Sequence, residues 1–230
     1  MTNIIKMKRK CAVCGKTGEY TVVLSTNTFG PPDLDTRPSE MARSTIDKWI
    51  QICPSCGYCA PDIGERIGDA ARIVRSAPYQ QQLNKRGAPR LANAFLCYSL
   101  LEESAGNYAN AGWACIYAAW VCDDAGCDVE ARKCRMKAVR LLQKARENGQ
   151  RFAEEVGEEE AIMVDLLRRS GEFELALKMC DEGLEKNPGK TISDILRFQK
   201  VLIRKRDVAR HTVAEATGEN EYIGGSDDTV

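Results

Sequence analysis

IQICPSCGYCAPD, residues 50–62, carries three closely spaced cysteines, Cys53, Cys56 and Cys59. Cys53 and Cys56 form a Cys-x-x-Cys pair that is followed directly by Gly57. Two thiolates at this spacing can converge on one metal ion, and a glycine after the second cysteine tolerates the positive φ that such a tight turn often needs. The segment therefore predicts one half of a metal site.

The other half of the site lies near the start of the chain, in the sequence CAVCGK. Cys11 and Cys14 repeat the same pair, again followed directly by a glycine. We call residues 11–15 the first knuckle and residues 53–57 the second knuckle. Two knuckles supply four thiolates, which are enough to close a tetrahedral structural zinc site. Iron would also suit four thiolates, and we choose zinc as the more common occupant. The predicted ligands of one structural Zn²⁺ per chain are Cys11, Cys14, Cys53 and Cys56.

The segment between the two knuckles predicts a small β module. EYTVVLST, residues 19–26, and STIDKWIQI, residues 44–52, are β-rich, and the Pro-rich sequence FGPPDLDTRPSE, residues 29–40, separates them. A strand, a loop and a second strand between two knuckles are typical of a zinc ribbon with an enlarged hairpin loop. We therefore predict a zinc-ribbon-like metal-binding module over residues 1–65.

The Pro-rich loop, residues 30–40, has two interpretations. Its prolines make it stiff, and four charged residues lie between or beside them. The loop is either a preorganised recognition element or an ordinary loop whose charges pair locally or face water. The four charged residues are Asp33, Asp35, Arg37 and Glu40.

Residues 66–211 show helical periodicity, and the breaks SAGNY, DDAGCD, ENGQ, RRSGEF and KNPGK carry Gly, Asn or Pro. Residues 159–189 resemble a tetratricopeptide repeat, with Gly171 in the turn between two helices. Residues 95–120 form a weaker copy around Gly106. We predict a mainly α protein in which the β module precedes about six antiparallel helices stacked as an irregular tetratricopeptide-like array. An ordinary helical bundle is the alternative.

Charge and hydropathy exclude several classes of protein. The chain has 33 basic and 33 acidic residues, which argues against a DNA-packaging protein or a polybasic membrane protein. No apolar run approaches the about 18 residues that cross a bilayer, and residues 1–10 lack an apolar signal segment. We expect a cytoplasmic protein without membrane contact, in which the eleven cysteines are reduced thiols or metal ligands. The polar end, residues 212–230, is expected to be a tail that is disordered or loosely docked.

The sequence offers little material for catalysis. His211 is the single histidine, and it lies in a polar region. The chain has neither a Walker A motif nor a G-x-G-x-x-G motif. Pairs of serine or cysteine with histidine are therefore not expected, and we predict that the protein is not an enzyme.

Three functions remain open, and the first is an adaptor. Stacked helix pairs form extended surfaces that bind peptides or partner helices, and a zinc ribbon adds a rigid second surface. We expect a protein partner in a groove of the helical array. The residues expected to line that groove are Tyr98, Asn107, Tyr108, Asn110 and Trp113.

The second function is nucleic-acid binding by the zinc module. Tyr20 and Trp49 are candidates to stack on bases. Phosphate contacts would make such binding depend on salt. The basic residues near the first knuckle are Lys6, Lys8, Arg9, Lys10 and Lys16.

The third function is a thiol redox sensor, which would use Cys59 with a knuckle cysteine. Cys59 also suits a small buried apolar position beside the metal, or an auxiliary ligand that replaces Cys56. Most of the remaining cysteines fall in apolar helical stripes and are expected in the core. They are Cys97, Cys115, Cys122, Cys127, Cys134 and Cys180.

The two halves together resemble the domain family of undefined function known as DUF2225. The resemblance rests on CAVCGK, DLDTRPSEM and WIQICPSCGYCAPD, followed by a helical region. It implies a metal-binding N-terminal module joined to a repeat-like helical region. It assigns a metal role to the four knuckle cysteines and implies no activity.

Overall fold

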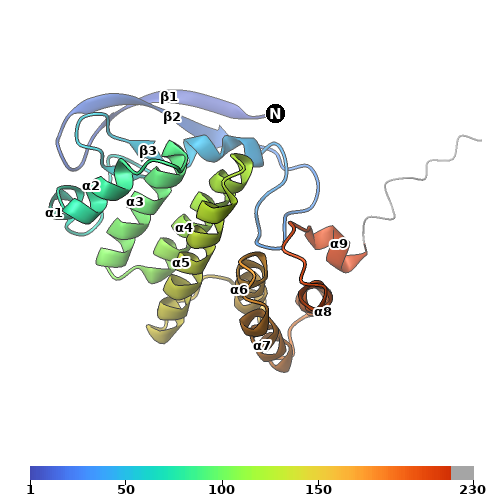
Figure 1. Ribbon diagram of the computed structural model, residues 1–230. Helices are drawn as coiled ribbons and strands as arrows, with labels where there is room; N and C mark the ends of the chain where they lie inside the picture. The colour runs from blue at the N-terminus through green and yellow to red at the C-terminus, as the bar shows by residue number, and fades with distance from the viewer. Residues whose placement is uncertain (219–230) are drawn as a thin grey trace, which may run out of the picture. The chain divides into compact units, whose positions relative to one another are not determined.

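The computed structural model describes residues 1–218, which divide into two compact units. The first unit contains Met1–Phe29 and Glu40–Phe152, and the second contains Gly30–Ser39 together with the described residues 153–218. The predicted fold class is confirmed, because a small β module is followed by packed antiparallel helices (Figure 1). The predicted boundary at residue 65 stays a prediction. In the described part of the chain, no helix is long and apolar enough to cross a membrane.

The β module consists of two separate hairpins. In the first, β1 (Asn3–Lys10) pairs antiparallel with β2 (Thr17–Ser25), and in the second β3 (Gln51–Ile52) pairs with β4 (Cys59–Ala60). Each hairpin therefore encloses one knuckle. The prediction that the strands between the knuckles form the ribbon's hairpin is wrong. Each knuckle is itself a tight turn, so the strands on its two sides become neighbours.

The predicted second strand over residues 44–52 is also largely wrong. Most of this segment lies in the 3-10 helix η1 (Arg43–Lys48), and only its end forms β3. The Thr45 hydroxyl donates a 2.7 Å hydrogen bond to the Ala42 carbonyl at the start of that helix. A local side-chain bond of this kind competes with pairing in a sheet, in spite of the β propensity of the threonine and isoleucine.

The helices of the first unit follow the β module. They are α1 (Ala70–Val74), α2 (Ala77–Leu83), α3 (Arg90–Ser104), α4 (Tyr108–Asp124) and α5 (Asp128–Glu147). Helix α4 packs between its neighbours in sequence, α3 and α5 (Figure 1). At the end of α3, Gly106 has a φ of 81° and the Asn107 N–H donates to the Glu102 carbonyl at 2.9 Å. A left-handed glycine of this kind ends a helix and satisfies its last carbonyl groups.

An aromatic cluster joins the β module to these helices. The Trp49 ring, directly after η1, packs edge-on against Tyr117 at 5.3 Å and Trp120 at 6.3 Å between centroids. Phe95 of α3 packs edge-on against the same Tyr117 ring at 5.5 Å. The Trp49 indole also donates a 2.8 Å hydrogen bond to Thr45. Each edge-to-face contact adds about 0.5–1.5 kcal/mol beyond area burial.

The helices of the second unit include the two helices that the tetratricopeptide-like segment predicts. They are α6 (Glu158–Arg169), α7 (Phe173–Glu185), α8 (Lys190–Arg204) and α9 (Val213–Thr217). Gly171 lies in the turn between α6 and α7 with a φ of 79°, as predicted. Ala176 and Gly183 of α7 are buried. Small residues at these positions let the backbone of α7 approach its neighbours closely.

The Pro-rich loop belongs to the second unit. Asp33, Asp35 and Arg37 are each no more than 3% exposed. Arg169 of α6 forms an ion pair with Asp35 at 3.3 Å. The Leu34 N–H donates to the His211 carbonyl at 3.0 Å. Asp33, Asp35 and Arg37 therefore lie inside this unit and do not face water, whereas Glu40 belongs to the first unit. Asp35 pairs with a residue of α6, so this part of the loop is structural.

Part of the predicted tail is ordered. Residues 213–217 form helix α9, which begins with a capping box between Thr212 and Glu215. A threonine cap with a glutamate three residues later satisfies two free N–H groups at the start of a helix. Residues 212–218 are therefore ordered and docked, the second of the two expectations, and residues 219–230 lie outside the described part.

Candidate metal centre

The two knuckles are built as the same backbone turn. In the first, the Gly15 N–H donates to the Cys11 carbonyl at 2.9 Å, and in the second the Gly57 N–H donates to the Cys53 carbonyl at 2.9 Å. Gly15 and Gly57 have φ values of 74° and 77°. These values lie in the left-handed region that glycine adopts without strain, which explains the glycine after each Cys-x-x-Cys pair.

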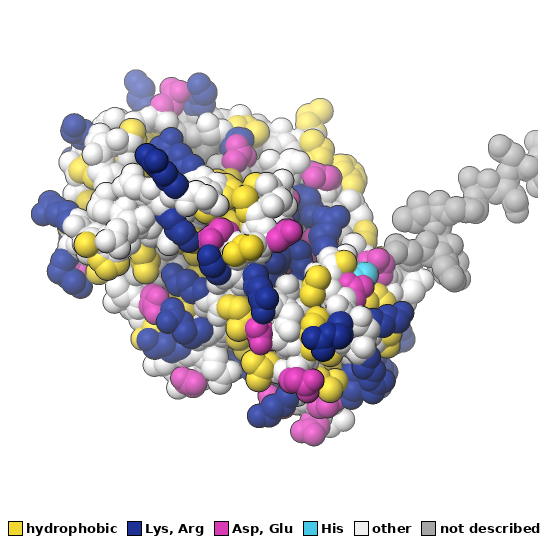
Figure 2. All heavy atoms as spheres, in the orientation of Figure 1, with side chains coloured by type: hydrophobic (Ala, Val, Ile, Leu, Met, Phe, Trp, Pro, Cys, Tyr) yellow, Lys and Arg dark blue, Asp and Glu magenta, His cyan; other side chains and the backbone are white. Residues whose placement is uncertain are grey.

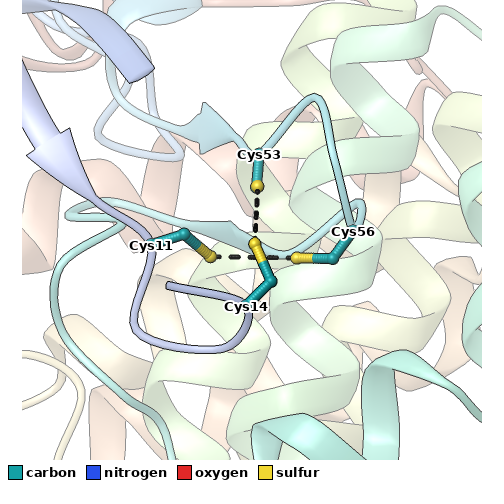
Figure 3. A group of neighbouring side chains, drawn as sticks. All are labelled: Cys11, Cys14, Cys53 and Cys56. Carbon is teal, nitrogen blue, oxygen red and sulfur yellow. Dashed lines mark hydrogen bonds between the residues drawn. The ribbon is translucent and has the colours of Figure 1, made fainter. Parts of the chain in front are cut away.

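The structure brings the four predicted ligands together (Figure 3). The Cys11 and Cys56 sulfurs lie 3.8 Å apart, and the Cys14 and Cys53 sulfurs lie 3.6 Å apart. All four sulfurs lie within 4.8 Å of one another. Zn–S bonds of about 2.3 Å in a tetrahedron place the sulfurs about 3.8 Å apart, so the cluster fits one Zn²⁺ ion.

Figure 3 shows how the two knuckles reach this point. The two loops approach from different directions, and the four side chains point toward a common centre. Cys11 and Cys53 are buried, Cys56 is half-buried and Cys14 is exposed. One edge of the site therefore faces solvent, and the rest is covered by protein.

The surroundings of Cys53 favour the thiolate, which is the form that binds metal. Burial acts to raise the pKa of Cys53, but the backbone N–H groups of Cys56 and Ser55 stabilise the thiolate, and the net pKa is lowered to about 7. Burial raises the pKa of Cys11 and of Cys56. One thiol is therefore prepared for ionisation, and a bound cation would stabilise the thiolates of the others.

Two tyrosines, Tyr20 and Tyr79, pack beside the metal site. The sequence did not predict either of them there. The Tyr20 side chain is buried beside the sulfurs, and burial together with Cys53 and Cys11 raises its pKa to about 12. The Tyr79 hydroxyl of α2 donates to the Gly57 carbonyl at 2.9 Å. Nothing in the local sequence marks either tyrosine, because their proximity to the knuckles comes only from packing.

A four-thiolate site is closed and leaves no position for water or substrate. Its role follows from the two-hairpin topology, because β2 and β3 are not paired with each other in the described structure. A backbone hydrogen bond from the Ala12 N–H to the Ile63 carbonyl, at 2.9 Å, connects the two knuckle regions. An ion bound to all four sulfurs would link both hairpins directly.

Cys59 is not brought into the ligand group. Its side chain is fully buried, and its thiol donates to the Gly57 carbonyl at 3.3 Å. Its backbone N–H donates to the Tyr79 hydroxyl at 3.1 Å. A hydrogen bond with the Cys97 thiol lowers the pKa of Cys59. Cys59 therefore occupies a small buried apolar position beside the metal site, which is one of the three interpretations given for it.

The helical cysteines lie mainly in the core, as expected. Cys127 is the half-buried exception, in the turn before α5. The thiols of Cys122 and Cys134 form a hydrogen bond between α4 and α5, and this bond raises the pKa of Cys134. The other buried members of the group are Cys97, Cys115 and Cys180.

The residues expected in a helical groove largely make contacts within the protein. The Trp113 indole donates to the Phe152 carbonyl at 3.2 Å, and the Asn107 amide donates to Glu102 at 2.7 Å. The Tyr108 ring lies under the Lys144 ammonium at 4.3 Å. Tyr98 is half-buried, and burial and a hydrogen bond to Glu102 raise its pKa. Asn110 is exposed.

The aromatic residues expected to stack on bases are engaged elsewhere, since Tyr20 is buried and Trp49 packs in the aromatic cluster. The lysines near the first knuckle are exposed, although Lys6 pairs with Glu19 at 3.1 Å. On the face drawn in Figure 2, basic side chains are interspersed with acidic ones. The exposed lysines near the first knuckle are Lys6, Lys8, Lys10 and Lys16.

Comparison with known proteins gives no relative, since no family model, curated protein or solved structure matches this chain. The resemblance to DUF2225 stays a prediction. The geometry of the site therefore carries the functional argument.

Proposed function

We propose that this protein is a non-enzymatic adaptor that binds a protein partner through its helical array. One structural Zn²⁺ ion per chain holds the β module as a rigid second contact surface. The observation that carries the proposal is the closed group of four sulfurs, all within 4.8 Å of one another. A site that offers four thiolates to one ion stabilises a fold and leaves no position for a substrate.

The distribution of contacts supports an adaptor in which the β module and the helices act together. Trp49 follows the helix η1 and packs on Tyr117 and Trp120 of α4. The Tyr79 hydroxyl of α2 bonds to the second knuckle. A metal that orders the β module would therefore also order the helical surface beside it.

The test is affinity purification of the tagged full-length chain from its own cells, with and without nuclease. A double variant, Cys53→Ser with Cys56→Ser, is purified in parallel. The matched control is Cys127→Ser, because Cys127 lies in a turn outside the metal cluster. We expect a protein partner that survives nuclease, is retained by the control and is reduced with the double variant.

Two outcomes contradict this proposal. The first is a purification in which the zinc-loaded chain retains no protein partner. The second is loss of every partner after nuclease treatment, which would favour nucleic-acid binding. The exposed lysines on β1 are the observation that favours nucleic-acid binding as a second function. Such binding should weaken steeply as the salt concentration rises.

A further inference from the structure

Two adjoining cavities lie beside the second knuckle, in the first unit. The first has a volume of about 550 Å³ and the second of about 410 Å³. Ile52 and Arg90 line both cavities, so the two adjoin. Their volumes fall within the range of about 300–1,000 Å³ that is usual for binding pockets.

The walls of the first cavity are the edges of two strands. Residues 19–21 of β2 and residues 50–52, which include β3, both line it, together with Asp47, Lys48, Arg90 and Leu91. Successive side chains of a strand point to opposite faces, so consecutive residues can all border a cavity only along the strand's edge. We call this space the inter-sheet slot, with residues 19–21 and 50–52 as its walls.

Both edges lack a strand partner within the described residues. In that part of the chain β2 pairs only with β1, and β3 pairs only with β4. An unpaired strand edge presents N–H and C=O groups that can pair with another chain. Two such edges across one cavity fit an extended polypeptide, because its main chain can pair on both sides.

The second cavity continues the path along the metal site. Residues 52–57, which include the ligands Cys53 and Cys56, form one side of it. Gln80, Leu83 and Asn84, at the end of α2, form the other side. Bound zinc would fix the conformation of this wall, since two of its residues are ligands.

The charges along the slot select an acidic occupant. Glu19 pairs with Lys6 at 3.1 Å, and Asp47 pairs with Lys48. Arg90 is exposed, lines both cavities and forms no ion pair within residues 1–218. Arg90 therefore offers a positive charge to a partner. A guanidinium binds a carboxylate through strong charge-assisted hydrogen bonds.

We propose that the inter-sheet slot binds an extended, acidic segment of a partner protein, which adds as a strand between β2 and β3. The main chain of the segment pairs with the two strand edges, and an acidic side chain pairs with Arg90. This inference rests on the proposed adaptor function, and it gives the second contact surface of that proposal, on the β module, a location and a partner chemistry.

The test uses the zinc-loaded full-length protein and a display library of random linear peptides. We expect enrichment of acidic peptides. Arg90→Glu should weaken the binding of a selected peptide by about tenfold or more, which corresponds to about 1.4 kcal/mol. The matched control, Arg86→Glu, changes an exposed arginine that does not line the cavities and should leave binding within about twofold.

A second measurement leaves the protein unchanged. Methylation of single backbone nitrogens along the selected peptide should weaken binding at consecutive positions of the paired stretch, because a strand directs its N–H groups to alternate sides and both sides are paired in the slot. Binding that is unaffected by Arg90→Glu, or that tolerates methylation at every other position, contradicts the slot. So does a library that yields no acidic peptide.

The slot and the adaptor function fail in different ways. If Arg90→Glu retains the native partner at the wild-type level, the slot is wrong and the adaptor function stands. If the wild-type chain retains no protein partner at all, the adaptor function itself is contradicted.

Discussion

The sulfur of Cys14 lies 3.6 Å from the sulfur of Cys53, although the two residues are 39 positions apart in the chain. The first belongs to the β1–β2 hairpin and the second to the β3–β4 hairpin. The site is therefore complete only when both hairpins have folded and met. In such a module, the free energy of metal binding contributes directly to folding.

Removal of zinc should unfold the β module selectively. We expect a chelator to release the amides of β1–β4 to rapid hydrogen exchange, while those of α6–α8 stay protected. The reason is that an ion on the four sulfurs would join two hairpins that do not pair with each other in the described structure, whereas these helices pack in the second unit. Hydrogen exchange with mass spectrometry measures both regions in one sample. Hairpin amides that stay protected after complete removal of the metal would disprove the structural role.

The ion pair between Asp35 and Arg169 should be essential to the second unit. Asp35→Ala leaves the Arg169 guanidinium, whose side chain is only 8% exposed, without this partner. Loss of one member of a buried pair costs about 3–5 kcal/mol. Urea unfolding, monitored by hydrogen exchange of the α6–α8 amides, measures this loss of stability. The control is Glu182→Ala, which removes an exposed pair with Lys178 and should cost less than about 1 kcal/mol. Equal losses of stability from Asp35→Ala and Glu182→Ala would contradict a structural role for the Pro-rich loop.

This pair also marks the limit of sequence reasoning. The metal ligands could be predicted because each Cys-x-x-Cys-Gly turn is local, and its chemistry is readable from adjacent residues. The helices could be predicted for the same reason, since their periodicity and the glycines in their turns are local. The Pro-rich loop could not be placed, because its composition is typical of a surface and Arg169 lies 134 positions from Asp35.

The pairing of the strands was predicted wrongly for a related reason. Residues 19–26 and 44–52 are both β-rich, and propensity cannot show which strand is the partner of which. The deciding contribution came from residues 3–10. They were considered only for their charge and as a possible signal segment, yet they form β1 and pair with β2. The inter-sheet slot lies where the expected hairpin would have closed.

Gly183 should not tolerate a side chain. A Cβ atom at this position would lie 2.8 Å from the Glu160 Cβ and 3.0 Å from a Leu196 methyl group. Overpacking costs about 1–3 kcal/mol, against about 1 kcal/mol that alanine gains in helix propensity. We expect a net loss of about 1 kcal/mol for Gly183→Ala, measured by denaturant unfolding. Lys178→Ala on the same helix is the exposed control and should change stability little. A stabilised Gly183→Ala protein would show that α7 packs less tightly than described.

Helix α9 should lose its order in acid. Burial acts to raise the pKa of Asp207, but the Ala209 N–H and the His211 ring lower it below the usual 3.8. A depressed folded pKa contributes stability above the unfolded pKa, and that stability is lost as the pH falls through the folded value. We expect the protection of α9 amides, corrected for intrinsic exchange, to fall below about pH 3.8. Asp207→Asn should weaken this pH dependence, and the same dependence in that variant would rule out the carboxylate as its origin.

Trp49 should act as a structural residue and not as a base-stacking one. Trp49→Ala removes the edge-on contacts with Tyr117 and Trp120, and we expect it to cost about 3 kcal/mol. Thermal unfolding measures this cost, and Phe29→Ala is the control, since Phe29 is 62% exposed. A Trp49→Ala protein that is fully stable but loses affinity for a single-stranded oligonucleotide would reverse the assignment.

The most direct test of the central claim is X-ray absorption at the metal edge, combined with the metal content of the protein purified without added metal. We predict one zinc ion per chain, surrounded by four sulfur atoms at about 2.3 Å. A metal-free protein that keeps its fold would contradict a structural zinc site, and so would a shell that contains oxygen or nitrogen ligands.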